Sequence, residues 1–396
     1  MSAPFEITGV AIGGIALAAW IYLLAGRGFF WLARERDDAG LPAEPAAWPE
    51  VVAVVPARNE ADVIEGSIGS LLAQDYPGAF RVVLVDDASE DGTAARAQGL
   101  AGASGRLTVL TGRPLPAGWT GKLWAVSQGV EAAEAQSQAP TYLWITDADI
   151  AHAPQTLRQL VARGEAGGLA LVSLMARLQT GTWPERLLIP AFVFFFDMLY
   201  PFAAVNDPRS RRAAAAGGVM LVRREALERA GGVAAIRAEI IDDCALGARL
   251  KAQGPIWLGL TRTSVSLRPY TTLGEIGRMV SRSAYAQLRY SPLLLAGTIA
   301  GMLLVYAAAP LLAVFAAGRA RWLGLAAWAL MAISFQPMLR YYRRSPLWGA
   351  LLPLIGAIYT TFTLQSAIAV WRGRGGMWKG RAQAAMPGAR SGPAHS

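Results

Sequence analysis

A run of twenty uncharged, mostly apolar residues lies near the N-terminus, at residues 7–26 (ITGVAIGGIALAAWIYLLAG). About 20 such residues can cross a lipid bilayer as a helix. Glu6 precedes the run, and Arg27 follows it. A cleaved signal peptide instead has a basic region before its apolar core. We therefore predict a transmembrane anchor over residues 1–30, with the N-terminus outside and the following residues in the cytoplasm.

Three more apolar segments lie near the C-terminus, at residues 292–317, 322–339 and 347–371, separated by short basic turns. They predict a transmembrane region over residues 292–371, followed by the basic tail 372–396. Three spans would leave this tail outside, although basic segments prefer the cytoplasmic side. The last segment is therefore either a span or a re-entrant segment, and both interpretations stay open.

Residues 187–204 are also apolar, but Pro190 and Pro201 interrupt them and Asp197 lies near their middle. A carboxylate at the centre of a bilayer costs roughly 2.5 kcal/mol or more. We therefore expect this segment to form an interfacial helix or an apolar lip for the acceptor, and not a span.

The composition narrows the classes of ligand. The chain has 396 residues, of which 54% are hydrophobic and 16% charged, and its net charge is +9. The basic residues flank apolar segments, which favours a bilayer and phosphate-bearing ligands and argues against nucleic acid. One cysteine excludes an internal disulfide. With two histidines in the chain, a metal would be held by carboxylates, which favours Mg²⁺ or Mn²⁺.

The middle of the chain alternates strand and helix patterns after a Pro/Ala linker. The linker occupies residues 31–49. Four short apolar runs rich in β-branched residues predict strands: VVAVVPA (51–57), RVVLVDD (81–87), RLTVLTG (106–112) and TYLWITD (141–147). Helical patterns lie between them, which indicates a mostly parallel sheet with helices on both faces. Ligands bind such sheets at the carboxyl ends of the strands.

Acidic residues follow two of these strands. Asp147 and Asp149 come directly after the fourth, and two carboxylates at this spacing can bind one divalent cation that keeps open positions for phosphate oxygens. Asp86 and Asp87 end the second strand, where they either form a turn or hydrogen-bond a base and ribose.

A third acidic pair, Asp242 and Asp243, lies at the predicted start of a helix. Acids at this position stabilise the helix N-terminus. A carboxylate there can also act as a general base.

Four motifs stand in a fixed order along the chain: PARNE (56–60), VDDASEDGT (85–93), TDAD (146–149) and DDCALGARL (242–250). With them, residues 50–292 resemble the family 2 glycosyltransferases of the GT-A fold. GWTGKLWA (118–125), GGVMLVRREAL (217–227) and the flanking apolar segments are similar to the lipid-directed branch of that family. This branch includes the ceramide glucosyltransferase-like and hopene-associated glycosyltransferases.

The resemblance implies a cytoplasmic α/β domain of the GT-A type over residues 50–270, between one N-terminal and about three C-terminal transmembrane helices. It implies a metal-dependent, inverting transfer of a single sugar from a nucleotide-sugar, a UDP-sugar, to a lipid acceptor such as a hopanoid. The enzyme would act at the cytoplasmic face of a bacterial-type plasma membrane.

The resemblance also implies roles for single residues. Asp243 would be the catalytic base, beside Asp242, which replaces the usual glutamate. Gly217 and Gly218 would lie beside the acceptor. Asp149, with Asp147, would bind the metal, although Asp147 could instead contact the sugar and ribose. The donor nucleotide would contact Pro56, Arg58, Glu60, Asp86, Asp87, Lys122 and Asp147.

The chain departs from the family after the base. The family often carries Gln-x-x-Arg-Trp, whereas here Arg289 and Tyr290 follow Ala286 at the glutamine position. An apolar stripe predicts one amphipathic interfacial helix over residues 271–291. Its Arg282 and Arg289 would contact the donor diphosphate, lipid phosphate, or both.

Three other functions are alternatives, and one observation argues against each. A processive polysaccharide synthase would need the Gln-x-x-Arg-Trp clamp that is degraded here. A non-catalytic membrane scaffold would not need the acids together. A transporter is disfavoured because the chain has about four spans and no internal repeats.

Overall fold

The structure is a computed structural model that describes residues 3–135, 139–373, 377–378 and 381–382. Its contacts divide the chain into two compact units. The sheet unit comprises residues 40–177 and 213–267 with the described residues from 367 on. The helical unit comprises the described residues up to 39, with 178–212 and 268–366. Residues 178–212, which lie inside the predicted domain 50–270, thus group with the apolar helices.

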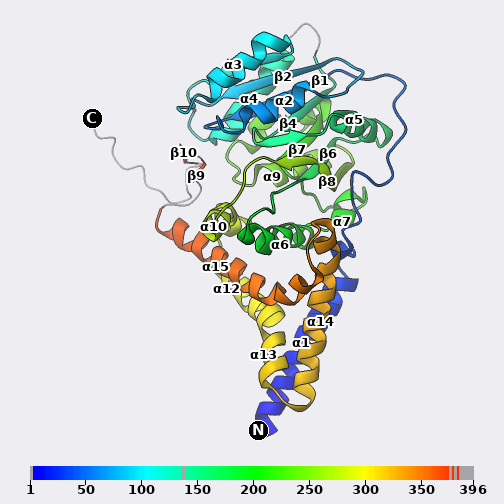
Figure 1. Ribbon diagram of the computed structural model, residues 1–396, viewed down its shortest axis with the longest axis vertical. Coiled ribbons are helices and arrows are strands. Elements are labelled where there is room, and N and C mark those ends of the chain that lie inside the picture. Colours follow the sequence, from blue (N-terminus) through cyan, green and yellow to red (C-terminus); the bar gives the residue numbers. More distant parts are fainter. Residues whose placement is uncertain (1–2, 136–138, 374–376, 379–380, 383–396) are drawn as a thin grey trace, which may run out of the picture. The chain divides into compact units, whose positions relative to one another are not determined.

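Within the described part of the sheet unit, eight strands form one mixed sheet in the order β3-β2-β1-β4-β7-β6-β8-β5 (Figure 1). The four predicted strands are present as β1 to β4, which pair in parallel. β7 runs antiparallel to both of its neighbours. The strands are β1 (Val51–Ala57), β2 (Phe80–Asp86), β3 (Leu107–Thr111), β4 (Tyr142–Thr146), β5 (Ile150–His152), β6 (Leu171–Arg177), β7 (Val219–Arg223) and β8 (Ile256–Ser266).

Helices cover both faces of this sheet. Apolar side chains of α2 and α5 pack in one buried cluster with alternate residues of β1. On the other face α4 approaches β1 so closely that a Cβ on Gly129 would lie 2.4 Å from Val54 Cγ1. The helices are α2 (Ile64–Leu72), α3 (Thr93–Ser104), α4 (Gly121–Glu134), α5 (Thr156–Ala166), α8 (Arg224–Arg229), η2 (Val233–Ile236) and α9 (Asp242–Lys251). Two short strands, β9 (Met377–Trp378) and β10 (Arg381–Ala382), pair with each other. Apart from residues 372 and 373, the rest of the predicted basic tail lies outside the described residues.

Four segments of the described chain are long and apolar enough to cross a membrane: Glu6–Ala25, Pro292–Phe315, Gly318–Tyr341 and Pro346–Trp371. They coincide with the predicted apolar segments. The segment 187–204 contributes the shorter helix α6 and is not among them. The elements are α1 (Ala3–Ala25), η1 (Phe30–Leu32), α6 (Trp183–Leu199), α7 (Phe202–Asn206), α10 (Leu273–Ser281), α11 (Ala284–Gln287), α12 (Pro292–Met302), η3 (Leu303–Ala307), α13 (Ala308–Phe315), α14 (Gly318–Tyr341), η4 (Pro346–Leu351) and α15 (Leu352–Trp371).

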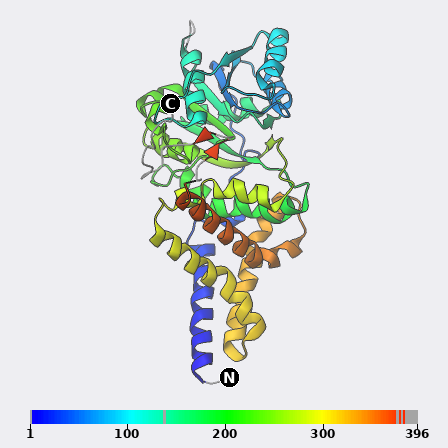
Figure 2. The ribbon, with the colours of Figure 1, turned by 90° about the vertical axis from the view of Figure 1, so that its left-hand side faces the viewer.

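Helices α1, α13 and α14 lie side by side within the helical unit (Figures 1 and 2). Small residues allow the close approach of α1 to α14: a Cβ on Gly13 would lie 2.9 Å from Leu323 Cβ. The indole of Trp20 is fully buried and donates a hydrogen bond to the Val305 carbonyl at 2.8 Å. Close packing of small residues is how apolar helices associate in a bilayer, where hydrophobic burial between helices contributes little.

The prediction of one continuous helix over residues 271–291 was wrong. α10 ends at Ser281 and α11 begins at Ala284. The Ser366 hydroxyl of α15 donates to the Ser281 carbonyl and accepts from the Tyr285 amide at 3.0 Å. In a continuous helix that amide would bond to that carbonyl. A side chain inserted into the ladder of backbone hydrogen bonds breaks a helix.

The start of α6 is held by a fully buried carboxylate, Glu185. It accepts hydrogen bonds from the amides of Gly181 and Thr182, both at 2.8 Å, and from the Tyr270 amide at 2.7 Å. The Thr182 contact, together with the bond that the Glu185 amide donates to Thr182 Oγ1 at 3.4 Å, closes a capping box at the helix N-terminus. The Tyr270 contact joins α6 to the segment before α10, so one side chain fixes two parts of the helical unit.

We expect Glu185→Gln to destabilise the helical unit by roughly 2 kcal/mol, because an amide NH₂ would face backbone N–H donors in a buried site. Thermal unfolding in detergent measures the change. Glu275→Gln is a matched control, since Glu275 closes the same kind of capping box at the start of α10 but is only partly buried. Equal shifts in Tm for the two variants would contradict the role of Glu185.

Candidate active site

The predicted site acids meet at one edge of the sheet because of the strand order. β2, β1 and β4 are adjacent and parallel, so the residues that follow them lie at the same edge. β7 is antiparallel to β4, so the residues that precede it, Gly217 and Gly218, lie at this edge too. The Thr146 hydroxyl fixes this register by donating to the Gly218 carbonyl at 2.7 Å.

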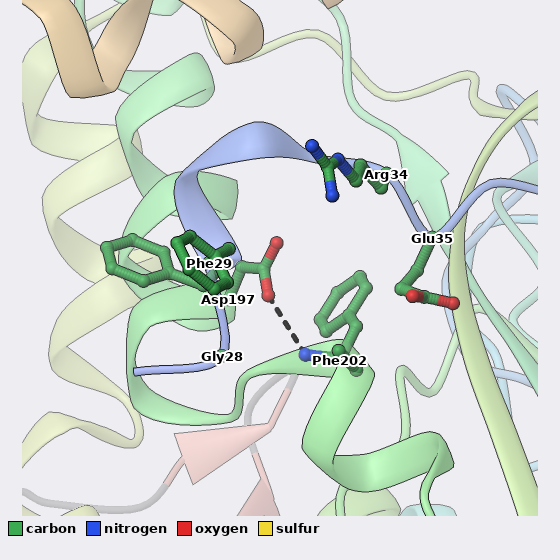
Figure 3. Close-up of a pocket in the computed structure, with 8 residues that line it drawn as sticks. Gly28, Phe29, Arg34, Glu35, Asp197 and Phe202 are labelled. Carbon is green, nitrogen blue, oxygen red and sulfur yellow. Dashed lines mark hydrogen bonds between the residues drawn. The ribbon is translucent and has the colours of Figure 1, made fainter. Parts of the chain in front are cut away.

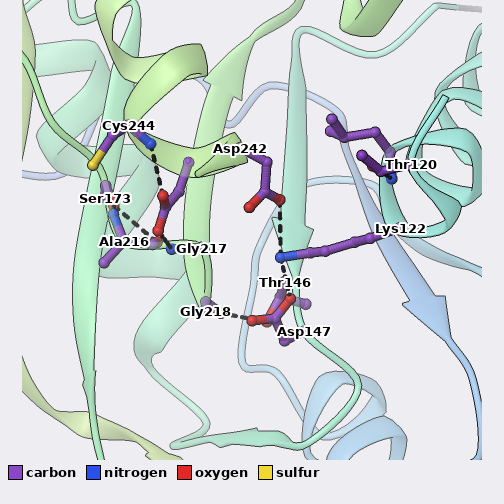
Figure 4. Close-up of polar contacts among 12 residues, drawn as sticks. Thr120, Lys122, Thr146, Asp147, Ser173, Ala216, Gly217, Gly218, Asp242 and Cys244 are labelled. Atoms are coloured by element: carbon purple, nitrogen blue, oxygen red, sulfur yellow. Dashed lines mark hydrogen bonds and ion pairs between the residues drawn. The ribbon is translucent and has the colours of Figure 1, made fainter. Parts of the chain in front are cut away.

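Lys122 lies at the centre of the acids, on the first turn of α4 (Figure 4). Its Nζ is 2.9 Å from Asp147 Oδ1 and 3.1 Å from Asp242 Oδ2. Burial of this amine lowers its pKa, but the carboxylates of Asp147, Asp242 and Asp243 outweigh that effect and hold the pKa well above its usual value. Lys122 is therefore a permanent cation that joins the end of β4 to the start of α9.

Asp243 is held by backbone amides. Its Oδ2 accepts from the Gly217 amide at 3.0 Å and its Oδ1 from the Cys244 amide at 2.7 Å. Burial and the charge of Asp242 raise its pKa to about 6, against the opposing effects of Lys122 and the two amides. A carboxylate with a pKa near neutrality has the property that a general base needs.

The two glycines have different neighbours. A Cβ on Gly217 would lie 3.3 Å from Lys122 Nζ and 3.5 Å from Asp243 Oδ2. A Cβ on Gly218 would instead lie 3.2 Å from Ala176 Cβ and 3.5 Å from Ile150 Cγ1. Gly217 thus borders the charged groups, whereas Gly218 packs in the core.

We expect Gly217→Ala to lower activity by about ten- to a hundredfold at nearly unchanged Tm, because its methyl group would lie between the amine and the carboxylate. Gly218→Ala is the matched variant, and we expect it to lower stability by about 1–2 kcal/mol through overpacking. Activity and thermal unfolding, measured on both variants, separate the two effects. The reverse pattern would contradict this assignment.

The loops after β1 and β2 are joined by a second cluster. Arg58 is buried, donates to the carbonyls of Asp87 and Ala88, and lies 3.7 Å from Asp87 Oδ2. The Glu60 amide donates to Thr93 Oγ1 at 2.8 Å. These contacts hold two loops at the edge where the donor nucleotide is predicted to bind.

Two other predicted donor residues are buried near these loops. Asp86 accepts from the Ser89 amide through Oδ2, whereas its Oδ1 is buried and has no hydrogen-bond partner in the described chain. Pro56 is buried inside β1, opposite Val85 of β2. The contacts of Asp86 and Pro56 with the donor nucleotide stay predictions.

The predicted metal residues lie around β5. Asp147 pairs with Lys122, and Asp149 is half-buried directly before β5, where its carbonyl accepts from the Leu267 amide at 2.7 Å. His152 lies between the hydroxyls of Thr146 and Ser264, and burial lowers its pKa to about 3, so it is a neutral core residue. In the described residues no three His, Cys, Asp or Glu side chains gather as a metal cage.

The two predicted diphosphate arginines belong to the helical unit. Arg282 caps the C-terminus of α10, and Arg289 follows α11 in a left-handed conformation with φ of 51°. Both side chains are exposed. Their contact with the donor stays a prediction.

Two residues of the site were not predicted. The buried Ser173 hydroxyl accepts from the Ala216 amide at 2.8 Å and so fixes the segment that leads to Gly217. Thr120 caps α4, which orients Lys122, and its side chain accepts from the Leu123 amide. A threonine before an apolar helical pattern is a sequence signal for such a cap, whereas nothing in the sequence indicates the contact of Ser173.

The comparison with protein families fits this geometry. Residues 52–231 match the family described as Glycosyl transferase family 2. The matched stretch is similar to this family and makes up less than half of the chain. This stretch includes the ends of β1, β2 and β4, Lys122 and the two glycines, whereas Asp242 and Asp243 follow it.

Two curated proteins similar to part of this chain are an N-acetylglucosaminyltransferase and a succinoglycan biosynthesis protein. An N-acetylglucosaminyltransferase of Rhizobium leguminosarum bv. viciae is 30% identical over 51% of this chain and 45% of its own length. The succinoglycan biosynthesis protein ExoO of Rhizobium meliloti (strain 1021) is 33% identical over 37% of this chain and 42% of its own length. The chain thus spans less than half the length of these relatives.

A solved structure has the same fold. The mannosyltransferase PcManGT from Pyrobaculum calidifontis, in complex with GDP-Man and Mn²⁺, is similar with a TM-score of 0.53. The similarity covers 92% of this chain and 98% of that chain at 21% identity. The predicted fold is confirmed: a GT-A-type sheet, with one apolar helix before it and three after it along the chain.

Proposed function

We propose that the chain is a membrane-anchored, inverting glycosyltransferase that moves a single sugar from a nucleotide-sugar to the hydroxyl of a lipid. The observation that carries this proposal is Asp243, whose carboxylate has a pKa of about 6 and borders Gly217 and Lys122 at the sheet edge. A family 2 domain in a chain with four apolar helices supports both the reaction type and the membrane location.

Asp243 would accept the proton of the acceptor hydroxyl. The hydroxyl oxygen would then attack the anomeric carbon, and the bond between that carbon and the diphosphate would break with its electron pair leaving on the diphosphate. Lys122 would hold Asp242 and Asp147 in place and limit the negative charge around the base. Removal of a proton in the transition state by a positioned base contributes about 10²- to 10⁴-fold to rate.

Asp147 and Asp149 are the residues that would hold a divalent cation. Carboxylates without histidine or cysteine suit a hard cation, and Mg²⁺ is typically bound by one or two carboxylates together with substrate phosphates. When bound, such a cation would neutralise charge on the departing diphosphate. The cation would be Mg²⁺ or Mn²⁺; the Mn²⁺ in the PcManGT complex makes Mn²⁺ the first to test.

The acceptor would come from the bilayer. Four candidate spans belong to the described chain, which gives a lipid direct access to the protein. We propose a UDP-sugar as donor and a hopanoid as acceptor, from the motifs that resemble the lipid-directed branch. The catalytic domain would lie in the cytoplasm, as the arginines after α1 favour.

Release of nucleoside diphosphate tests the proposal. Purified chain is incubated with Mg²⁺ or Mn²⁺ and a panel of donors that includes UDP-sugars and GDP-mannose, with and without total bacterial lipid. We expect one donor to release its nucleoside diphosphate, and lipid to increase the rate. Release that is independent of lipid would contradict a lipid acceptor.

The pH profile follows from the base. Because the deprotonated carboxylate is the active form, activity falls about tenfold per pH unit below a pKa of about 6 and levels off above it. Asp242→Asn removes a like charge beside Asp243, so we expect its profile to shift to lower pH. The rates of the wild type and of this variant are measured at about ten pH values between pH 4.5 and pH 8. The two profiles give the apparent pKa of the base in each protein. A flat profile would contradict Asp243 as the base.

A second candidate is a processive polysaccharide synthase. The observation that favours it is the similarity to the succinoglycan biosynthesis protein. Product length discriminates the two functions. With excess donor, a single-sugar transferase gives one product, whereas a synthase gives a ladder of products that lengthens with time.

A further inference from the structure

A cavity of about 210 Å³ lies within the helical unit, and its lining includes none of the predicted catalytic, donor or metal residues (Figure 3). Its lining comes from the loop after α1, the end of α6 and the start of α7. Pockets for drug-sized ligands occupy about 300–1,000 Å³, so this cavity suits a smaller group. The lining residues are Gly28, Phe29, Phe30, Arg34, Glu35, Asp197, Phe202 and Ala203.

Asp197 is the buried polar group of this cavity, with 3% of its surface exposed. Its Oδ1 accepts from the Phe202 amide at 3.1 Å, which is the one hydrogen bond that this carboxyl group forms within the described chain. Burial and the charge of Glu35 raise the pKa of Asp197 well above its usual value. The protein therefore keeps a carboxyl group in an apolar site without supplying a cation for it.

The nearby arginines do not fill that role. Arg27 donates to the carbonyls of Met198 and Leu199 at 2.6 and 3.3 Å, which caps the C-terminus of α6. Arg34 also lines the cavity, but its side chain is exposed to solvent. Glu35 accepts from Asn206 Nδ2 at 3.0 Å and keeps a negative charge at the cavity.

The walls are aromatic. Phe30 and Phe202 are buried, and Phe29 is half-exposed at the rim with a left-handed backbone of φ 51°. Aromatic rings attract cations over their faces and are the common walls of ammonium sites. The lining has two acids, one arginine and aromatic walls, which disfavours an anion, and two carboxylates alone do not form a metal cage.

The position of the cavity indicates the source of the ligand. It follows directly on α1, whose candidate span ends at Ala25, so it lies at the level where lipid headgroups meet an apolar helix. We propose that the cavity binds the ammonium group of a phospholipid headgroup, held by the carboxylate of Asp197, the charge of Glu35 and the rings of Phe29, Phe30 and Phe202. This site is independent of the proposed sugar transfer.

Native mass spectrometry of the full chain, stripped of lipid in detergent, tests the proposal. The probes are phosphatidylethanolamine, its N-acetylated derivative, which lacks the ammonium charge, and phosphatidylglycerol. We expect at least about tenfold better retention of phosphatidylethanolamine than of the other two. Equal retention of phosphatidylethanolamine and its N-acetyl derivative by the wild type would overturn the proposal.

Variants locate the site. Asp197→Asn keeps an acceptor for the Phe202 amide but loses the charge, so we expect it to abolish the preference. Asp38→Asn is the matched control, an exposed acid on the same loop, and should keep it. If Asp197→Asn fails to fold, Glu35→Gln is tested in its place. We expect this variant to lose severalfold of the preference for phosphatidylethanolamine over its N-acetyl derivative. An unchanged preference in a folded Asp197 or Glu35 variant overturns the site.

A last arm distinguishes the source of the ammonium. Free ethanolamine is added to the chain in phosphatidylglycerol nanodiscs, and the Tm is measured. We expect no shift at millimolar ethanolamine, because the amine alone lacks the lipid anchor. A shift that Asp197→Asn removes would assign the cavity to a soluble amine and overturn the lipid source.

Discussion

Replacing Asp243 by asparagine is expected to reduce sugar transfer by about 10²- to 10⁴-fold, the usual contribution of a general base. Asparagine has nearly the same shape and keeps an oxygen for the Gly217 or Cys244 amide, so the fold should persist. It cannot accept the acceptor proton. The rate at saturating donor and lipid measures the loss.

Donor binding separates this effect from a structural one. Titration calorimetry with the donor should give a Kd for Asp243→Asn within a few-fold of the wild type, because the base acts on the acceptor. Asp242→Asn is the comparison, since it keeps the base and should retain much of the activity at neutral pH. An Asp243→Asn chain that turns over at the wild-type rate would remove Asp243 from the mechanism.

Replacing Lys122 by methionine is expected to have the second largest effect. Its amine bridges Asp147 and Asp242 and opposes the rise in the pKa of Asp243. The side chains of Lys122 and Asp242 are 16% and 19% exposed, so this pair is largely shielded from water. Breaking a fully buried pair costs about 3–5 kcal/mol, and partial exposure of Asp147 reduces the expectation to roughly 2–3 kcal/mol.

The same substitution should shift the pH profile. Without the ammonium, the charge of Asp242 acts on Asp243 unopposed, so the pKa of the base rises and activity at neutral pH falls. Lys122→Arg is the control that keeps the charge with a different geometry. It should restore most of the stability and part of the rate. A methionine variant with the Tm and pH profile of the wild type would exclude Lys122 from this role.

Much of this site could be predicted from the order of the strands. Acids at the ends of β2 and β4 were expected at the same edge, because both strands pair in parallel with β1, which lies between them. The start of α9 at Asp242 was also predictable from the helical pattern. The position of Gly217 beside Asp243 was not derivable, because it depends on β7 pairing antiparallel to β4, and local sequence does not specify a strand's partner.

The rest depended on contacts distant in sequence. Lys122 was expected to reach the nucleotide, but in the structure it bridges two acids, 25 and 120 residues further on. The apolar stripe over residues 273–288 indicated one helix, and the break between α10 and α11 comes from Ser366 of α15. A pattern within one segment contains no information about a hydroxyl that inserts from another helix.

The mass of the lipid product tests sugar transfer most directly. Purified wild-type chain is incubated with the donor panel, a divalent cation and total bacterial lipid, and the lipid phase is analysed by mass spectrometry. We expect one lipid species heavier by a single sugar residue, formed in equal amount with the nucleoside diphosphate and absent with Asp243→Asn. Nucleoside diphosphate without a glycosylated lipid, or no product with any donor, would contradict the proposed function.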